Sequence, residues 1–197
     1  MVMMIAGIVF ASAVSALVAP PLEPPPALEE FSDTRFRERA VAEYDDGVLQ
    51  VVASYAHAQA RHDSRWLYLQ IGFGATESIS IRPDDVVLVR PDGGEVPVAS
   101  PRDHRRDIGG VRQLQNEARN WHHRVIDYIR QPAGFRFFFG VHPRGGVPDR
   151  IARLGRQRHA WGDLYFVSPD GMWEAGVYSL VVRRGDDVIA RLPVVLE

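Results

Sequence analysis

The stretch RWLYLQIGF, residues 65–73, decides the fold class of this chain. Two sets of side chains alternate along it, which is the period of a β-strand with two different faces. The residues expected on one face are Leu67, Leu69, Ile71 and Phe73, and those on the other are Trp66, Tyr68 and Gln70. The stretch therefore predicts a strand that packs an apolar face against a core.

Further strand-like runs lie on both sides of this stretch, and tight-turn residues separate them. The turns are expected at Asp45–Gly47, Pro91–Gly94 and Gly185–Asp187. Short β-rich runs at spacings of about 8–12 residues with Gly and Asp turns indicate an antiparallel sandwich or barrel. No alternation of strand and helix recurs, which argues against a parallel α/β fold. We expect a mainly all-β chain, built as an antiparallel β-sandwich.

One segment departs from the period of two. Its apolar residues recur at intervals of 3, 4, 3, 4 and 3, which is a helical stripe. They are Val111, Leu114, Ala118, Trp121, Val125 and Tyr128. We expect one inserted amphipathic helix over about residues 110–130, packed across a sheet edge or the mouth of the sandwich. The Phe-rich run that follows, 135–141, returns to the strand pattern.

The N-terminal region resembles that of an exported protein. Residues 5–19 are uncharged, apolar or small, and this length fits a signal-peptide core better than a membrane span of about 20 residues. No basic residue precedes the run, so a buried N-terminal helix is the alternative. We divide the chain into a signal-like segment (1–19), a Pro-rich linker (20–36) and a single domain (37–197) with its helical insertion at 108–132. The expected location is periplasmic or secreted, with no stable membrane span in the mature chain.

Charge is distributed unevenly although the net charge is only −2. Residues 102–158 hold thirteen Arg and five acidic residues, a local net charge of +8, between two acidic flanks. Such a centre can face an anionic partner, or the flanks can fold against it and neutralise it. The candidate anion-binding residues are Arg102, Arg105, Arg106, Arg153 and Arg156. Aromatic residues are sparse among them, which disfavours nucleic acid as the partner.

The sequence offers no motif for catalysis or metal binding. The absence of Cys removes disulfides, thiol nucleophiles and thiolate zinc sites. Neither a G-x-S-x-G nor an H-E-x-x-H pattern occurs, and the adjacent histidines 122 and 123 would diverge on a helix. We interpret the seven histidines as surface and interface residues, and we expect no catalytic residue, no metal and no cofactor.

Near the C-terminus the segment MWEAGVYSLVV, residues 172–182, resembles the tyrosine corner of immunoglobulin-like sandwiches. Glu174, Gly176 and Tyr178 match the acidic–x–Gly–x–Tyr pattern, with Glu in place of the usual Asp and no Cys two residues after the tyrosine. The resemblance is to the cysteine-free, bacterial style of such domains. It implies an immunoglobulin-like fold in which the Tyr178 hydroxyl bonds to nearby backbone, and it implies no specific function.

These features favour a non-catalytic binding or structural module of the cell envelope. The partner would be an anionic envelope component or an acidic protein. The alternative is a metal-dependent or other enzyme with its site beside the inserted helix. That alternative requires His104, His122, His123 or His142 to converge in space.

Overall fold

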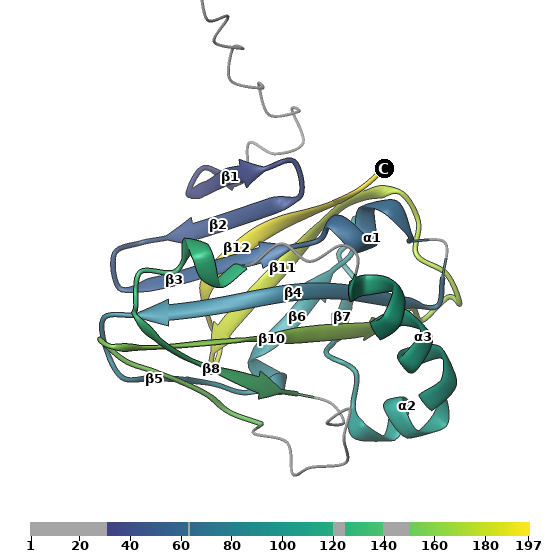
Figure 1. Ribbon diagram of the computed structural model, residues 1–197. Helices are drawn as coiled ribbons and strands as arrows, with labels where there is room; N and C mark the ends of the chain where they lie inside the picture. Colours follow the sequence, from purple (N-terminus) through teal and green to yellow (C-terminus); the bar gives the residue numbers. More distant parts are fainter. Residues whose placement is uncertain (1–30, 63, 120–124, 140–149) are drawn as a thin grey trace, which may run out of the picture.

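The alternating stretch forms most of β4 (Trp66–Ala75), a strand near the middle of the largest sheet. The computed structural model describes residues 31–62, 64–119, 125–139 and 150–197 (Figure 1). The four apolar residues predicted for one face of β4 lie in the main core, whereas Trp66 and Tyr68 belong to a second apolar cluster on the other face. The predicted division of faces is confirmed.

The larger sheet has six strands in the order β1-β2-β3-β4-β10-β8. All its neighbours are antiparallel except β8 and β10, which run parallel. This pair departs from the purely antiparallel pattern that we expected, because the chain from β8 to β10 is long enough for the crossover that parallel strands need. The other strands of this sheet are β1 (Thr34–Glu38), β2 (Val41–Asp45), β3 (Leu49–Ser54), β8 (Ala133–Phe138) and β10 (Arg158–Val167).

A four-stranded antiparallel sheet, in the order β12-β11-β6-β7, lies behind the larger sheet in Figure 1. Buried side chains from both sheets form the main core between them. The chain is therefore a mainly β protein with a sandwich-like arrangement and few helices, as predicted. The strands of this sheet are β6 (Val86–Val89), β7 (Glu95–Pro97), β11 (Gly176–Arg184) and β12 (Asp187–Leu196), and a small separate pair is formed by β5 (Ile79–Ile81) and β9 (Ala152–Leu154).

The helical insertion is confirmed, but it is divided where we expected one continuous helix. It contains α2 (Pro101–Arg106), α3 (Ile108–Ala118) and the 3-10 helix η4 (Val125–Tyr128). Val125 packs with Val41 and Val52, away from the cluster that receives α3. The spacing of apolar residues in the sequence cannot reveal that the later residues of the stripe, such as Val125, pack against another part of the sheet. Two short helices lie elsewhere, namely α1 (Ala56–Ala60) and η2 (Pro83–Asp85).

Two observed boundaries differ from the predicted ones. The folded domain begins earlier than residue 37, because Phe31 is buried and β1 starts at Thr34, inside the predicted linker. The insertion begins at Pro101, seven residues before the predicted start at 108. Ser100 caps α2 in a reciprocal pair with Asp103, and Pro101 occupies the first helical turn, where it is well tolerated. The signal-like segment and most of the linker lie outside the described residues.

Two glycines in β4 let the end of the insertion cross the larger sheet closely. A Cβ atom at Gly72 would collide with the side chain of Ile129, and one at Gly74 with that of Gln131. Gln131 also donates a hydrogen bond to the carbonyl of Ala75, at 3.1 Å. The segment after η4 is thereby held against the outer face of the sheet, the face turned away from the main core.

Candidate functional site: the arginine-rich helical end

The helices α1, α2 and α3 gather at one end of the sandwich (Figure 1). Asp107 attaches them there, since it accepts a hydrogen bond from the indole Nε1 of Trp66 at 2.7 Å and another from the backbone N–H of Gly110 at 3.1 Å. Val111, Leu114 and Ala118 then face the outer side of the larger sheet. We call this region, comprising the described residues of segments 56–66, 101–119 and 168–175, the helical end.

Two histidines are buried beneath these helices, which corrects their interpretation as surface residues. His57 and His104 are only 3% and 1% exposed. The ring of His104 lies between Trp66 and Tyr165, with centroids 5.5 and 5.1 Å away, and His57 meets Tyr68 edge-on. A sequence signal existed for His104, because it lies seven residues before Val111 and so extends the helical stripe.

These histidines are neutral at pH 7. Burial lowers the pKa of both rings, more than the nearby carboxylates of Glu117 and Asp103 can raise it. Both nitrogens of His57 and the Nε2 of His104 are buried without a hydrogen-bond partner among the described residues. The Nε2 of His57 is 4.0 Å from an Oε2 of Glu117. Both rings pack against the aromatic side chains of the second apolar cluster.

Two tyrosines form polar contacts beside the same cluster. Tyr68 donates a hydrogen bond to Asp163 at 3.0 Å, and Arg136 pairs with that carboxylate from the other side. Tyr165 accepts a hydrogen bond from Gln115 of α3 at 3.1 Å. Burial, with the charge of Asp163 adding to it, raises the pKa of both hydroxyls well above their ordinary range. Both therefore stay protonated, which suits them to anchoring the insertion and not to nucleophilic attack.

The surface above this cluster is basic. Arg102, Arg105 and Arg106 lie exposed on α2. Four more arginines join them, namely Arg61, Arg65, Arg112 and Arg119. None of the seven forms an ion pair with a described carboxylate, whereas arginines elsewhere in the domain do. The described acidic residues of the helical end are Asp103, Asp107, Asp170, Glu117 and Glu174, and Asp170 is paired with Arg90.

The other two predicted arginines lie elsewhere. Arg156 donates to the carbonyl of Thr76, just after the last residue of β4, and Arg153 belongs to β9. The helical end, by contrast, lies at the other end of β4, where His104 of α2 contacts Trp66, the first residue of that strand. Ten residues of strand separate these positions by roughly 30 Å at about 3.3 Å per residue. The five candidates therefore form two groups, three at the helical end and two elsewhere. With the four additional arginines, the group at the helical end has seven members.

The residues of the predicted tyrosine corner lie beside the helical end. The hydroxyl of Tyr178 donates to the carbonyl of Glu174 at 2.9 Å, and its ring meets Trp173 edge-on. Trp173 in turn donates to the carbonyl of Arg65 at 3.2 Å. This network fixes the loop between β10 and β11, which ends just before Gly176, the first residue of β11. The resemblance to immunoglobulin-like domains itself stays a prediction.

No group of three or more metal-binding side chains occurs within the described ranges. The convergence that the enzymatic alternative requires involves His122, His123 and His142, which lie outside those ranges together with Trp121. Of the four histidines, His104 alone is described. The alternative therefore stays a prediction. In the part of the chain that the structure describes, no helix has both the length and the apolar character to cross a membrane.

Comparisons with known proteins add no relative. The chain matches no known protein family, no curated protein and no solved structure. Function must therefore be inferred from the geometry of the helical end.

Proposed function

We propose that this chain is an exported, non-catalytic binding module of the cell envelope, and that its helical end holds an anionic partner. One observation carries the proposal: seven arginines gather there without a carboxylate partner among the described residues. Counted over the sequence, segments 56–66, 101–119 and 168–175 hold seven arginines and six acidic residues, and Arg90, which is paired with Asp170, brings the net charge of this end to +2 (eight minus six). A surface of one sign attracts a partner of the other sign.

The chemistry of the arginines suits phosphate or carboxylate. A guanidinium group presents several N–H donors in a planar fork, which matches the paired oxygens of these anions. The amino end of α3 is already occupied by the carboxylate of Asp107. The partner would therefore be held by side chains and not by the helix terminus. Export rests on the N-terminal sequence pattern, and an acidic protein remains within the class of partner proposed.

Retention of the full chain on phosphocellulose tests this function. The variant Arg102→Gln/Arg105→Gln/Arg106→Gln removes three charges from the helical end. The matched control, Arg82→Gln/Arg184→Gln/Arg191→Gln, removes three exposed arginines elsewhere that likewise have no described ion pair. We expect the wild type and the control to elute together and the first variant at much lower salt. Equal elution of both variants would show that total charge, and not the helical end, causes retention.

A further inference from the structure

Two exposed apolar side chains belong to the helical end. Ile108 begins α3 between Arg106 and Arg112 and is 42% exposed. Met172 lies in the turn between β10 and β11 and is 60% exposed. Large apolar side chains that are exposed on the same part of a protein as unpaired basic residues are typical of proteins that dock on a membrane interface.

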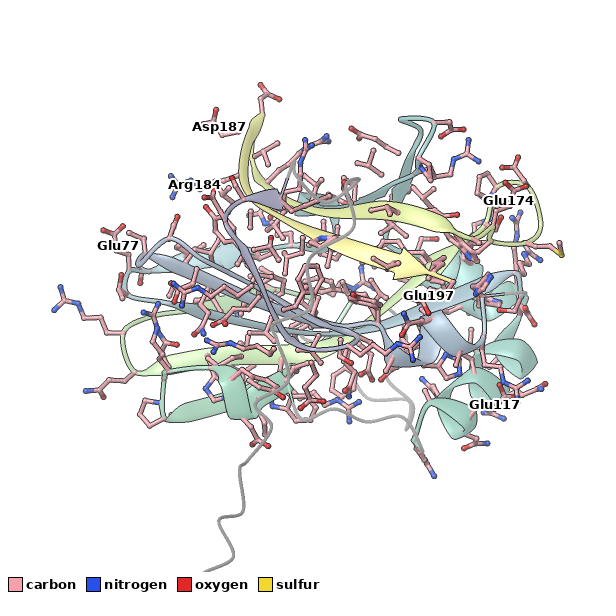
Figure 2. All side chains as sticks on the ribbon, turned by 90° about the horizontal axis from the view of Figure 1, so that it is seen from above. Glu77, Glu117, Glu174, Arg184, Asp187 and Glu197 are labelled. Atoms are coloured by element: carbon pink, nitrogen blue, oxygen red, sulfur yellow. The ribbon has the colours of Figure 1, made fainter. Side chains whose placement is uncertain are left out.

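Both side chains belong to the same end of the molecule. The carbonyl of Arg65 accepts hydrogen bonds from Ser168 and Trp173, which flank the turn that holds Met172. The next residue, Trp66, bonds to Asp107, the neighbour of Ile108. Figure 2 shows the labelled Glu117 and Glu174 on one side of the domain, and Arg184 and Asp187 on the opposite side. Segments 65–66, 107–108 and 168–173 thus meet at the helical end.

We propose that the anionic partner is the phosphate-bearing surface of a lipid bilayer, on which the helical end docks. This inference rests on the proposed function and deepens it. The arginines bind lipid phosphates, and Ile108 and Met172 enter the zone between the headgroups and the acyl chains. Electrostatic attraction and apolar insertion act together at such a surface, and neither one alone gives stable attachment.

The two apolar residues distinguish a bilayer from a soluble polyanion or an acidic protein. A polyanion uses the arginines only, because it offers no apolar phase for Ile108 and Met172. A bilayer uses both kinds of residue. The carboxylates of the helical end do not cancel the attraction, because the arginines there outnumber them.

Co-sedimentation of the full chain with vesicles tests the proposal. Vesicles of phosphatidylcholine alone give the baseline, and vesicles containing phosphatidylglycerol give the signal above it. The variant Ile108→Ser/Met172→Ser keeps every charge. The control Val48→Ser/Val188→Ser changes two apolar residues of similar exposure, 41% and 47%, away from the helical end: Val48 lies in the turn between β2 and β3, and Val188 lies at the start of β12. Each variant carries the same N-terminal segment, and a thermal melt verifies that it folds.

We expect the Ile108/Met172 variant to lose about tenfold or more of its affinity for anionic vesicles, with unchanged retention on phosphocellulose. The control should match the wild type in both assays. Vesicle binding that is insensitive to Ile108 and Met172 would overturn the lipid inference. Retention on phosphocellulose without vesicle binding would also overturn it, while leaving the proposed function standing. Failure to bind either would overturn both.

Discussion

Trp66 and Asp107 join the β-sandwich to its helical insertion through one hydrogen bond, from the indole Nε1 to Oδ2 at 2.7 Å. Asp107 also accepts from Gly110 and so caps α3. The indole N–H, followed by the backbone N–H of Gly110, lowers the pKa of the Asp107 carboxyl. One carboxylate thus fixes both the start of the helix and its place on the sheet.

Replacing Asp107 with Ala should destabilise the domain by about 1–3 kcal/mol, because a helix cap is lost and the indole N–H of Trp66 is left without its partner. Urea unfolding followed by tryptophan fluorescence measures the change. Asp186→Ala, in an exposed turn, is the control and should stay within about 0.5 kcal/mol of the wild type. Equal stabilities of the two variants would show that the Trp66–Asp107 bond contributes nothing.

Acid should weaken the domain before its carboxylates titrate. Burial holds the pKa of His57 and His104 below the ordinary 6.5, so the unfolded chain binds more protons than the folded one. Stability is therefore complete above pH 6.5 and is lost as the pH falls through the depressed values, with a slope of up to about 1.4 kcal/mol per pH unit for each histidine.

Unfolding in urea between pH 7.5 and 5 measures this slope. Carboxylates with a lowered pKa, such as Glu43 and Asp107, contribute at lower pH, below their ordinary values of 4.5 and 3.8. The double variant His57→Gln/His104→Gln should flatten the dependence between pH 6.5 and 5, whatever its absolute stability. An unchanged slope in that variant would assign the effect to other groups.

The hydroxyl of Tyr178 should stabilise the fold measurably. Tyr178→Phe removes its bond to the carbonyl of Glu174, and we expect a loss of about 0.5–1.5 kcal/mol in urea unfolding. Tyr44→Phe is the matched control, because its hydroxyl reaches only the exposed Asp46, at 3.3 Å. The control should change by less than half as much. Identical losses would mean that the Tyr178 bond has no special weight.

Gly162 should tolerate no side chain. A Cβ atom there would lie 2.7 Å from both the ring and the carbonyl oxygen of Phe137 on β8. We expect Gly162→Ala to cost about 1–3 kcal/mol or to prevent folding, since the backbone of a paired strand cannot yield. Gly155→Ala, with open space around it, should leave the melting temperature unchanged or slightly raised. Similar melting of both variants would contradict the close β8–β10 packing.

The sequence determined the strands and their faces. Alternation along β4 predicted which side chains enter the main core, and the turn residues at 45–47, 91–94 and 185–187 marked three hairpins that the structure contains. These features are predictable because side-chain direction in a strand and the geometry of a tight turn depend on a few adjacent residues. The same holds for Val111, Leu114 and Ala118, which occupy the buried face of α3 as their spacing indicated.

Only the tertiary structure decided what lies at the helical end. The spacing of apolar residues could not show that the insertion divides after α3, or that Val125 packs on β2 and β3. Counting charges along the sequence could not show that Arg156 and Arg105 lie in different regions. It also could not show that Arg61 and Arg65 belong to the same end as α2, because these residues are far apart in the chain. Local conformation depends on residues that are adjacent in the sequence. The composition of a surface and the burial of a histidine depend instead on which distant segments of the chain come together.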